Sequence, residues 1–340
     1  MLKVRGDSMF ENQVIFITGG TGSLGQYLTK KLLTEKIKEI RIFSRNEALQ
    51  VEMERDINDE RVKFIIGDIC DEKRLIETMK GSDYVFHLAA LKHVPICEMQ
   101  PEEAININIM GTMKVIHASI INKVKKVVAM SSDKAVNPCN VYGMTKALEE
   151  KLIVIANKIS DITKFACVRS GNLMGSNGSV IPLFIEQLKE GKDISITDKN
   201  MTRYFVTSDE TVQLLLDVAK ISHGGEIFFM NMSSLNILKL VEVLHKYYGD
   251  KPLKIKYMGI RPGEKLNEEI ISIDEQPNTF KLNDKYYIVV PDIIKDCLYD
   301  KYCNYSKVDF SNTSSKYNQL ENNEIENKLA EAKIIDRGII

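Results

Sequence analysis

The sequence lacks the cysteine and histidine spacings that mark metal or redox proteins. Its 340 residues include six cysteines, which are scattered and form no C-x-x-C pair. Zinc-binding modules and dithiol enzymes place cysteines or histidines at short, regular spacings, so neither class is indicated and no metal is expected. We interpret the cysteines as the reduced thiols of a cytoplasmic protein.

Long hydrophobic runs are also missing. The first residues, MLKVRGDSMFENQ, contain no apolar segment of the kind found in secretory signal peptides. A membrane-spanning helix needs about 18 or more apolar residues in a row, and no uninterrupted run of that length occurs. The sequence therefore predicts a soluble, cytoplasmic protein without a membrane partner.

An excess of basic charge is absent. Lysine and arginine number 46 against 47 acidic residues, which gives a formal net charge of −1. General nucleic-acid binders carry a strongly basic surface, so no nucleic-acid partner is expected, and any anionic ligand must be held by local groups. Because 44% of the residues are hydrophobic, the chain can bury the core of one large domain or two modest ones.

What the sequence does contain is a regular alternation of short apolar runs with longer amphipathic segments. The apolar runs are VIFITGG, EIRIFSR, VKFIIGD, YVFHLAA, KVVAMSS and KFACVRS. This rhythm is typical of an α/β fold in which helices cover both faces of a parallel sheet. It predicts a Rossmann-type, doubly wound nucleotide-binding domain over residues 10–172.

Beyond residue 172 the alternation loosens. We expect residues 173–295 to form mainly a smaller substrate-binding α/β domain, with a helix over 181–190, while the segment of about 204–232 returns to the first domain. Residues 296–340 form a polar tail, rich in asparagine, serine and glutamate between about 304 and 327. Such a composition favours a tail lying on the surface or partly disordered.

The segment TGGTGSLG follows the first apolar run and opens a helical pattern. Glycines at this spacing let the backbone turn tightly and approach a pyrophosphate, whose charge then meets a helix N-terminus. A tight turn without a ligand is the alternative. The candidate cofactor-binding residues in this segment are Thr18, Gly19, Gly22, Ser23, Leu24 and Gly25.

The end of the second apolar run indicates which nicotinamide cofactor is bound. It ends in Ser44 and Arg45 rather than in an acidic residue, and a guanidinium suits the 2′-phosphate of NADP. A solvated arginine is the alternative. Asp68, after VKFIIG, is expected either to accept from the adenine amino group or to cap a helix. Ile69 and Ala89 are assigned to the same cofactor site.

The segment SSDKAVNPCNVYGMTK carries the candidate chemistry. Tyr142 and Lys146 are one helical turn apart, so both side chains can reach one pocket and contact the cofactor. We expect the Lys146 ammonium to lower the pKa of the phenol from about 10, so that Tyr142 takes a hydroxyl proton during oxidation. Ser132, at the end of the preceding strand, completes the hydrogen-bonded set.

The glycine loop, the strand-end serine and YGMTK resemble the extended short-chain dehydrogenase/reductase family. Within it, SSDKAVNPCNVYGMTK, MTRYFVTSDE and GIRPGEKLNEEI resemble the inverting, 5-epimerising UDP-N-acetylglucosamine 4,6-dehydratases of pseudaminic acid biosynthesis. The likeness runs from about residue 14 to about residue 292. It implies a tightly bound NADP that is recycled, a UDP-sugar substrate and a homo-oligomer.

The resemblance also implies roles for Asp133 and Lys134. Oxidation at C4 acidifies the C5 proton, so that a base can remove it while an acid protonates the departing C6 hydroxyl. Retaining relatives carry Asp-Glu at this position, so we expect Asp133 to be the acid and Lys134 the C5 base. For this role the pKa of Lys134 should fall toward about 7 or 8 through Lys146 and partial burial. A surface lysine is the alternative, and either Tyr142 or Lys134 could return the C5 proton.

The UDP end of the substrate should meet the later segments. Arg203 and Arg261 are candidate pyrophosphate ligands, and Glu264 could accept from the uridine ribose. The resemblance adds Lys92 and Asn172 to this pocket. The chain departs from the family where Ser170 replaces a tyrosine, which removes an aromatic ring near the expected sugar pocket.

Three other functions stay open at this point. A UDP-hexose 4-epimerase of the same fold would need only Ser132, Tyr142 and Lys146, whereas a retaining dehydratase would differ in product stereochemistry. A non-catalytic NADP-binding regulator is disfavoured because the tyrosine and the lysine are both present.

Overall fold

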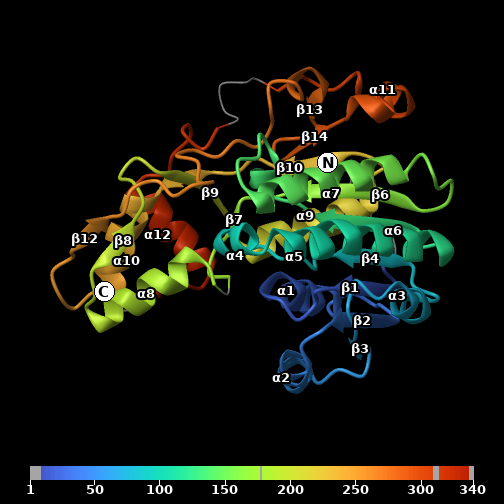
Figure 1. The fold of residues 1–340 in the computed structure, drawn as a ribbon, viewed down its shortest axis with the longest axis horizontal. Coiled ribbons are helices and arrows are strands. Elements are labelled where there is room, and N and C mark those ends of the chain that lie inside the picture. The colour runs from blue at the N-terminus through green and yellow to red at the C-terminus, as the bar shows by residue number, and fades with distance from the viewer. Residues whose placement is uncertain (1–8, 177, 309–313, 337–340) are drawn as a thin grey trace.

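A large parallel sheet forms the centre of the protein (Figure 1). The computed structural model describes residues 9–176, 178–308 and 314–336. The sheet has nine strands in the order β13-β14-β10-β6-β5-β4-β1-β2-β3. Its strands are β1 (Val14–Thr18), β2 (Glu39–Ser44), β3 (Val62–Ile66), β4 (Tyr84–His87), β5 (Lys126–Met130), β6 (Lys164–Arg169), β10 (Ile227–Met230), β13 (Thr279–Lys281) and β14 (Tyr286–Val289).

Strands β1 to β6 and β10 pair in parallel, which confirms the predicted Rossmann-type α/β fold. The chain runs outward from β1 to β3 and then restarts at β4 on the other side of β1. Ligands of such sheets bind beyond the carboxyl ends of the strands, at the point where the order reverses. The fold therefore places a binding crevice beyond β1 and β4.

Helices cover both faces of this sheet (Figure 1). Helix α6 packs against both α3 and α7, whereas α1 and α9 pack together. Strands such as β1 are buried along their whole length, as parallel strands between two helical layers are. The helices are α1 (Ser23–Leu32), α2 (Glu47–Ile57), α3 (Glu72–Met79), α4 (Val94–Met99), α6 (Thr112–Ile121), α7 (Val141–Ala156) and α9 (Ser208–Ile221).

One helical run is longer and more apolar than we expected of any segment in this chain. Residues Pro101–Ile121, comprising α5 (Pro101–Ile105), a π-helical stretch (Asn106–Gly111) and α6, are long and apolar enough by length and composition to cross a membrane. The sequence did not single the run out because Lys114 and several polar residues interrupt it. Half of its most apolar window is buried within the protein, and α6 packs on α3 and α7. The run is thus part of the helical layer on the large sheet.

A smaller lobe with its own hydrophobic core lies beside the large sheet, at the left of Figure 1. Fully buried side chains such as Ile181, Leu240 and Leu329 form this core. The expected helix over 181–190 is present as α8. The elements of the lobe are α8 (Val180–Glu190), α10 (Ile237–Tyr248), α12 (Asn322–Glu331), and the short strands β7 (Asn172–Leu173), β8 (Ile194–Ile196), β9 (Thr202–Val206), β11 (Ser234–Asn236) and β12 (Ile255–Tyr257).

Two segments lie elsewhere than the sequence indicated. The strands β13 and β14, expected in the substrate-binding segment, extend the edge of the large sheet by antiparallel pairing on β10. The expected polar tail contains α11 (Lys295–Tyr302) and α12. Their apolar residues recur at four-residue spacing, so Leu298 with Tyr302, and Ile325 with Leu329, each form one buried helix face. A few apolar residues at helical spacing are therefore enough to form these helices, although the average composition of the segment is polar.

Candidate active site

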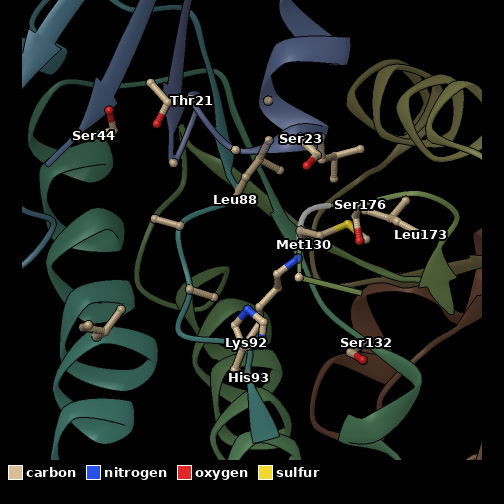
Figure 2. Close-up of a pocket in the computed structure, with 18 of the residues that line it drawn as sticks. Thr21, Ser23, Ser44, Leu88, Lys92, His93, Met130, Ser132, Leu173 and Ser176 are labelled. Carbon is tan, nitrogen blue, oxygen red and sulfur yellow. The ribbon is translucent and has the colours of Figure 1, made fainter. Parts of the chain in front are cut away.

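A cavity of about 560 Å³ opens beyond the carboxyl ends of β1, β4 and β5. Figure 2 shows Ser44, Lys92 and Ser132 among the side chains around it. The cavity therefore joins the glycine loop to the segment that carries the candidate chemistry. The predicted residues that line it are Gly19, Gly22, Ser23, Leu24, Gly25, Ser44, Arg45, Asp68, Ile69, Ala89, Lys92, Ser132, Lys134, Tyr142, Lys146 and Asn172.

The glycine loop has the close packing that a phosphate-binding turn requires. Gly19 has φ +66°, and a Cβ there would lie 2.7 Å from the Cα of Ala89. A Cβ on Gly25 would overlap the backbone of Gly20. These positions exclude side chains, so the backbone at the start of α1 is left open to an anion, as a bound dinucleotide requires.

Thr18 lies outside the cavity, contrary to its assignment as a cofactor ligand. It is fully buried, and its Oγ1 lies 2.7 Å from Nδ1 of His87 and accepts from the backbone N–H of Ala89. Burial lowers the pKa of His87 to about 3, so this histidine is neutral. The pair joins β1 to β4 and supports the glycine loop from beneath.

The second strand end carries the groups expected at the adenosine side. Arg45 Nη1 lies 3.6 Å from Asp68 Oδ2, and both side chains are well exposed. Asp68 Oδ1 accepts from the backbone N–H of Cys70, whereas Asp71 caps α3. The helix-capping alternative for Asp68 is therefore wrong, and its second oxygen faces Arg45 at the cavity.

Lys146 is paired with a buried carboxyl group on the same helix. Its Nζ donates to Oε2 of Glu149 at 2.5 Å, and both side chains are almost fully buried. Burial raises the pKa of the Tyr142 phenol above its ordinary value, and a hydrogen bond with Ser132 only partly opposes this. The expected lowering of the Tyr142 pKa is therefore wrong for the protein alone.

Lys134 lines the cavity, so the surface-lysine alternative is wrong. It follows β5 in a short 3₁₀ turn (Asp133–Ala135), which the Ser132 hydroxyl caps. Lys134 Nζ donates to Oδ1 of Asp133 at 3.0 Å and to Oδ1 of Asn172 at 3.2 Å. Asp133 is fully buried behind it and also accepts from the Ser132 hydroxyl at 2.9 Å.

The charge state of Lys134 is opposite to the one the sequence indicated. Burial alone would lower its pKa, but the carboxylates of Asp133 and Glu268 outweigh burial and raise it. Glu268 Oε1 lies 3.6 Å from Lys134 Nζ. Lys146, the expected cause of a lowered pKa, is paired with Glu149 instead. Lys134 is therefore an ammonium ion in the protein alone.

The expected pyrophosphate ligands do not gather at the cavity. Arg203 lies on β9, buried, and donates to the carbonyl oxygens of Thr202 and Leu266. Arg261 and Glu264 occupy the loop after β12 and contact each other through the Arg261 backbone N–H. Of the predicted substrate residues, only Lys92 and Asn172 line the cavity. The assignment of the other three to one ligand set with them is therefore not supported by this geometry.

Two buried glutamates that the sequence analysis missed complete the site. Glu149 follows Lys146 by three residues on α7, a spacing at which helix side chains meet, so it could have been found. Glu268 reaches Lys134 only through the tertiary fold.

Among the described residues, no group of three or more histidine, cysteine, aspartate or glutamate side chains is arranged to hold a metal ion.

Comparisons with known proteins place the chain among sugar-nucleotide enzymes. Residues 15–290 match the family model described as polysaccharide biosynthesis protein. The UDP-glucose 4-epimerase of Rickettsia bellii (strain RML369-C) is 43% identical over 300 residues, which span 86% of this chain and 87% of that protein. The uncharacterized membrane protein MJ1061 of Methanocaldococcus jannaschii is 42% identical over 289 residues, 83% of this chain and 87% of its own length.

A solved structure extends the likeness over almost the whole molecule. The crystal structure of Pen from Bacillus thuringiensis is 37% identical in sequence and has a TM-score of 0.89. The match covers 96% of this chain and 100% of that chain. The chain belongs to the polysaccharide biosynthesis protein family, and with it to the extended short-chain dehydrogenases/reductases that act on nucleotide sugars.

Proposed function

We propose that the protein is an NADP-dependent UDP-N-acetylglucosamine 4,6-dehydratase that inverts C5. The product would be UDP-2-acetamido-2,6-dideoxy-β-L-arabino-hex-4-ulose, for nonulosonic acid or surface glycan synthesis. The observation that carries the proposal is the position of Lys134, which lines the cavity beside Tyr142 and contacts Asp133. We further propose that the enzyme is a cytoplasmic homo-oligomer.

The first half of the proposed reaction uses Ser132, Tyr142 and Lys146. The chemistry that a bound nicotinamide supplies is hydride acceptance from C4 and hydride return to C6. Tyr142 takes the proton of the C4 hydroxyl, and Ser132 holds that oxygen by a hydrogen bond. All three side chains line the same cavity, and general base catalysis requires the base within hydrogen-bond reach of the proton that it takes.

The second half uses Asp133 and Lys134. The ammonium proton that Lys134 Nζ donates to Asp133 would first pass to that carboxylate, which leaves Lys134 as the neutral amine and Asp133 as the acid. Once C4 is a ketone, Lys134 takes the C5 proton, and the C6 hydroxyl leaves as water with the proton held by Asp133. Asp133 Oδ2 is buried without a hydrogen-bond partner among the described residues, so it can carry that proton. Ser132 and Lys134 both contact its Oδ1 and line the cavity, so they connect it with the sugar.

The proposed preference for NADP is supported by Arg45. Its guanidinium is 60% exposed at the cavity, where it can pair with a 2′-phosphate. Without a bound cofactor, Arg45 forms one ion pair with the neighbouring Asp68. Releasing the nucleotide from denatured enzyme and identifying it by mass tests this preference, and recovery of NAD alone would refute it.

A UDP-hexose 4-epimerase is the second candidate, favoured by the chain's likeness to the UDP-glucose 4-epimerase of Rickettsia bellii. Epimerisation requires oxidation and reduction at C4 but no elimination, so it gives Asp133 and Lys134 no chemical task. Their direct contact at the cavity favours a dehydratase. A retaining dehydratase would share this site and differ only in the configuration of its product at C5.

Proton NMR of the reaction in heavy water distinguishes these candidates. Purified enzyme is incubated with UDP-N-acetylglucosamine while absorbance reports any net cofactor reduction. We expect a C6 methyl signal, deuterium at C5, inverted configuration and no net reduced cofactor. A 4-epimer with its C6 hydroxyl intact would refute the dehydratase, and a retained configuration at C5 would refute the inversion.

Replacing Lys134 tests its role as the base. Lys134→Ala should abolish dehydration and leave cofactor binding intact, because Lys134 contacts the turn after β5 and not the glycine loop. Fluorescence titration with NADP checks binding, and the NMR assay checks product. A variant with wild-type dehydration would refute the assignment.

A further inference from the structure

A carboxylate from a distant part of the chain forms part of the wall around Lys134. Glu268 lies between β12 and β13 and is 3% exposed. Its Oε1 lies 3.6 Å from Lys134 Nζ and 3.7 Å from Arg203 Nε. Its Oε2 is buried without a hydrogen-bond partner among the residues that the structure describes. No step of the proposed reaction uses this side chain.

The C-terminal segment fixes the backbone of Glu268. The N–H of Glu268 donates to Oγ of Ser315 at 2.8 Å, and the N–H of Ser315 donates to the carbonyl oxygen of Glu268 at 2.8 Å. Ser315 is fully buried, and its Oγ lies 2.9 Å from Oγ1 of Thr202 on β9. Ser315 therefore fixes the backbone of Glu268, from which the buried carboxylate extends toward Lys134.

The charges around Lys134 balance only when Glu268 is included. Two cations, Lys134 and Arg203, face two carboxylates, Asp133 and Glu268. All four side chains are mostly or fully buried, and a buried charge needs a partner of opposite sign. Without Glu268, the cluster would hold one more cation than anion.

We propose that Glu268 is a positioning residue that keeps Lys134 charged and directed toward Asp133 and Asn172 until the sugar binds. It would thereby set the pH range in which Lys134 can act as a base. The kinetic part of this inference rests on the proposed function, because only a reaction that uses Lys134 as a base responds to its charge. The electrostatic part does not depend on any reaction.

The effect of removing the Glu268 charge has a definite sign. Asp133 and Glu268 raise the pKa of Lys134, whereas burial and Arg203 lower it. In Glu268→Gln one of the two raising groups is gone, so Lys134 loses its proton at lower pH than in the wild type. Glu268→Asp keeps the charge. Glu269→Gln is the matched control, since Glu269 is half-exposed and bonds Asn137 instead.

The first experiment titrates Lys134 directly and needs no turnover. Enzyme labelled with carbon-13 at the lysine Cε is followed by NMR against pH, and the Lys134 signal is identified by its loss in Lys134→Ala. We expect Glu268→Gln to move the titration of this signal to lower pH, while Glu268→Asp and Glu269→Gln leave it near the wild-type position. An unchanged titration in Glu268→Gln, or an equal change in Glu269→Gln, would overturn the proposal.

The second experiment measures dehydration against pH with UDP-N-acetylglucosamine. In Glu268→Gln the acid limb of the kcat/KM profile should move to lower pH. The ratio of kcat/KM in the variant to kcat/KM in the wild type should therefore be roughly tenfold higher at low pH, on the acid limb, than at the pH where both enzymes have reached their maximum. A uniform loss at every pH would mean structural damage and would count against the proposal. Glu268→Ala repeats both measurements if the glutamine variant does not fold.

The two experiments separate this inference from the function on which it partly rests. A wild-type enzyme that forms no 6-deoxy product refutes the proposed dehydratase, whatever the NMR titration gives. A dehydratase whose Lys134 titration ignores Glu268 refutes the inference and leaves the function standing.

Discussion

The residue pair Lys146 and Glu149 shows how burial changes the chemistry expected from a sequence motif. The two side chains meet at 2.5 Å, both almost fully buried, on the same face of α7. Burial raises the pKa of Glu149 to about 7, and Lys146 opposes the rise without cancelling it. Glu149 therefore changes its charge near neutral pH, beside the lysine that contacts the cofactor in the proposed reaction.

This pair predicts a specific dependence of stability on pH. A carboxyl whose pKa is raised on folding contributes stability below its ordinary pKa of 4.5 and loses that contribution as the pH rises through about 7. Over that range we expect a loss of about 3 kcal/mol in the free energy of unfolding. Glu149→Gln should lack this loss, and urea unfolding at several pH values measures it.

The control for this prediction is Glu102→Gln, because Glu102 is exposed at the start of α5. Its unfolding free energy should follow that of the wild type at every pH. If Glu149→Gln shows the same pH dependence as the wild type, the raised pKa of Glu149 is wrong.

At the residue scale, the sequence indicated which side chains line the cavity better than it indicated their charges. Ser132, Lys134, Tyr142 and Lys146 all line it, because a strand end and one helix turn place them by local geometry alone. The pKa expected for Lys134 was wrong because Asp133, the adjacent residue, and Glu268, from another part of the chain, together raise it. Local spacing cannot reveal a partner that only tertiary packing supplies.

At the scale of elements, the contact between α7 and the turn after β5 aligns the proposed acid and base with Tyr142. A Cβ on Gly143 would overlap the carbonyl oxygen of Lys134, so the helix packs directly on that turn. Asn140 caps α7 by accepting from the N–H of Gly143 at 2.7 Å, and its Nδ2 donates to the carbonyl oxygen of Gly263 at 2.8 Å. One side chain thus joins the helix to the loop after β12.

Adding one methyl group to α7 should displace Lys134. In Gly143→Ala the turn must move away from the helix, and a shift of about 1 Å at a catalytic group can lower a rate roughly a hundredfold. We expect dehydration to fall by about that factor while NADP binding changes little, because the glycine loop lies on β1 and α1. Rate measurements and NADP titration on the same preparation test this.

Gly81→Ala provides the comparison for this prediction. Gly81→Ala adds the same methyl group at a residue with φ +76°, but the new Cβ would meet no heavy atom within 4 Å. It should cost about 1 kcal/mol of stability through backbone strain and leave the rate unchanged. Equal rates for Gly143→Ala and the wild type would contradict the proposed role of this contact.

At the scale of the whole molecule, the alternation of apolar runs with amphipathic segments predicted the parallel strands. It did not predict the two antiparallel strands at the edge of the sheet or the C-terminal helices. The strands β1 to β6 are short, mostly apolar runs, which indicate parallel strands between helical layers. Strand β13 (TFK) carries no such run, and β14 (YYIV) is apolar but pairs antiparallel with β10, outside the alternation of helices and parallel strands. Helix α12 has too few apolar residues to stand out in a polar stretch, although two of them are fully buried.

One arginine connects the sheet, the active-site helix and the segment before β13. Arg169, at the end of β6, is 2% exposed. Its Nε and Nη2 donate to the two carboxylate oxygens of Glu150 at 2.8 and 2.7 Å. Its Nη1 and Nη2 donate to those of Glu275 at 2.9 and 2.6 Å, and Nη1 also donates to the carbonyl oxygen of Ile270. Removing this guanidinium would leave two carboxylates without their cation.

Arg169→Met should therefore destabilise the whole fold. Breaking a buried ion pair from one side costs about 3–5 kcal/mol, which we expect as the loss in the free energy of unfolding near neutral pH. Burial would raise the pKa of Glu275, but Arg169 outweighs burial and lowers it. A lowered pKa contributes stability that is present above the ordinary value of 4.5 and is lost as the pH falls. The difference between wild type and variant should accordingly shrink toward about pH 4.

Urea unfolding of wild type, Arg169→Met and Arg261→Met at about pH 7 and about pH 4 measures this difference. Arg261 is exposed on a loop, so its variant should stay within about 0.5 kcal/mol of the wild type at both pH values. Because the two carboxylates are the reason for the loss, Glu150→Gln combined with Arg169→Met should recover part of it. A loss that is the same at both pH values and unaffected by Glu150→Gln would mean that Arg169 stabilises the fold by packing its side chain and not by its charge.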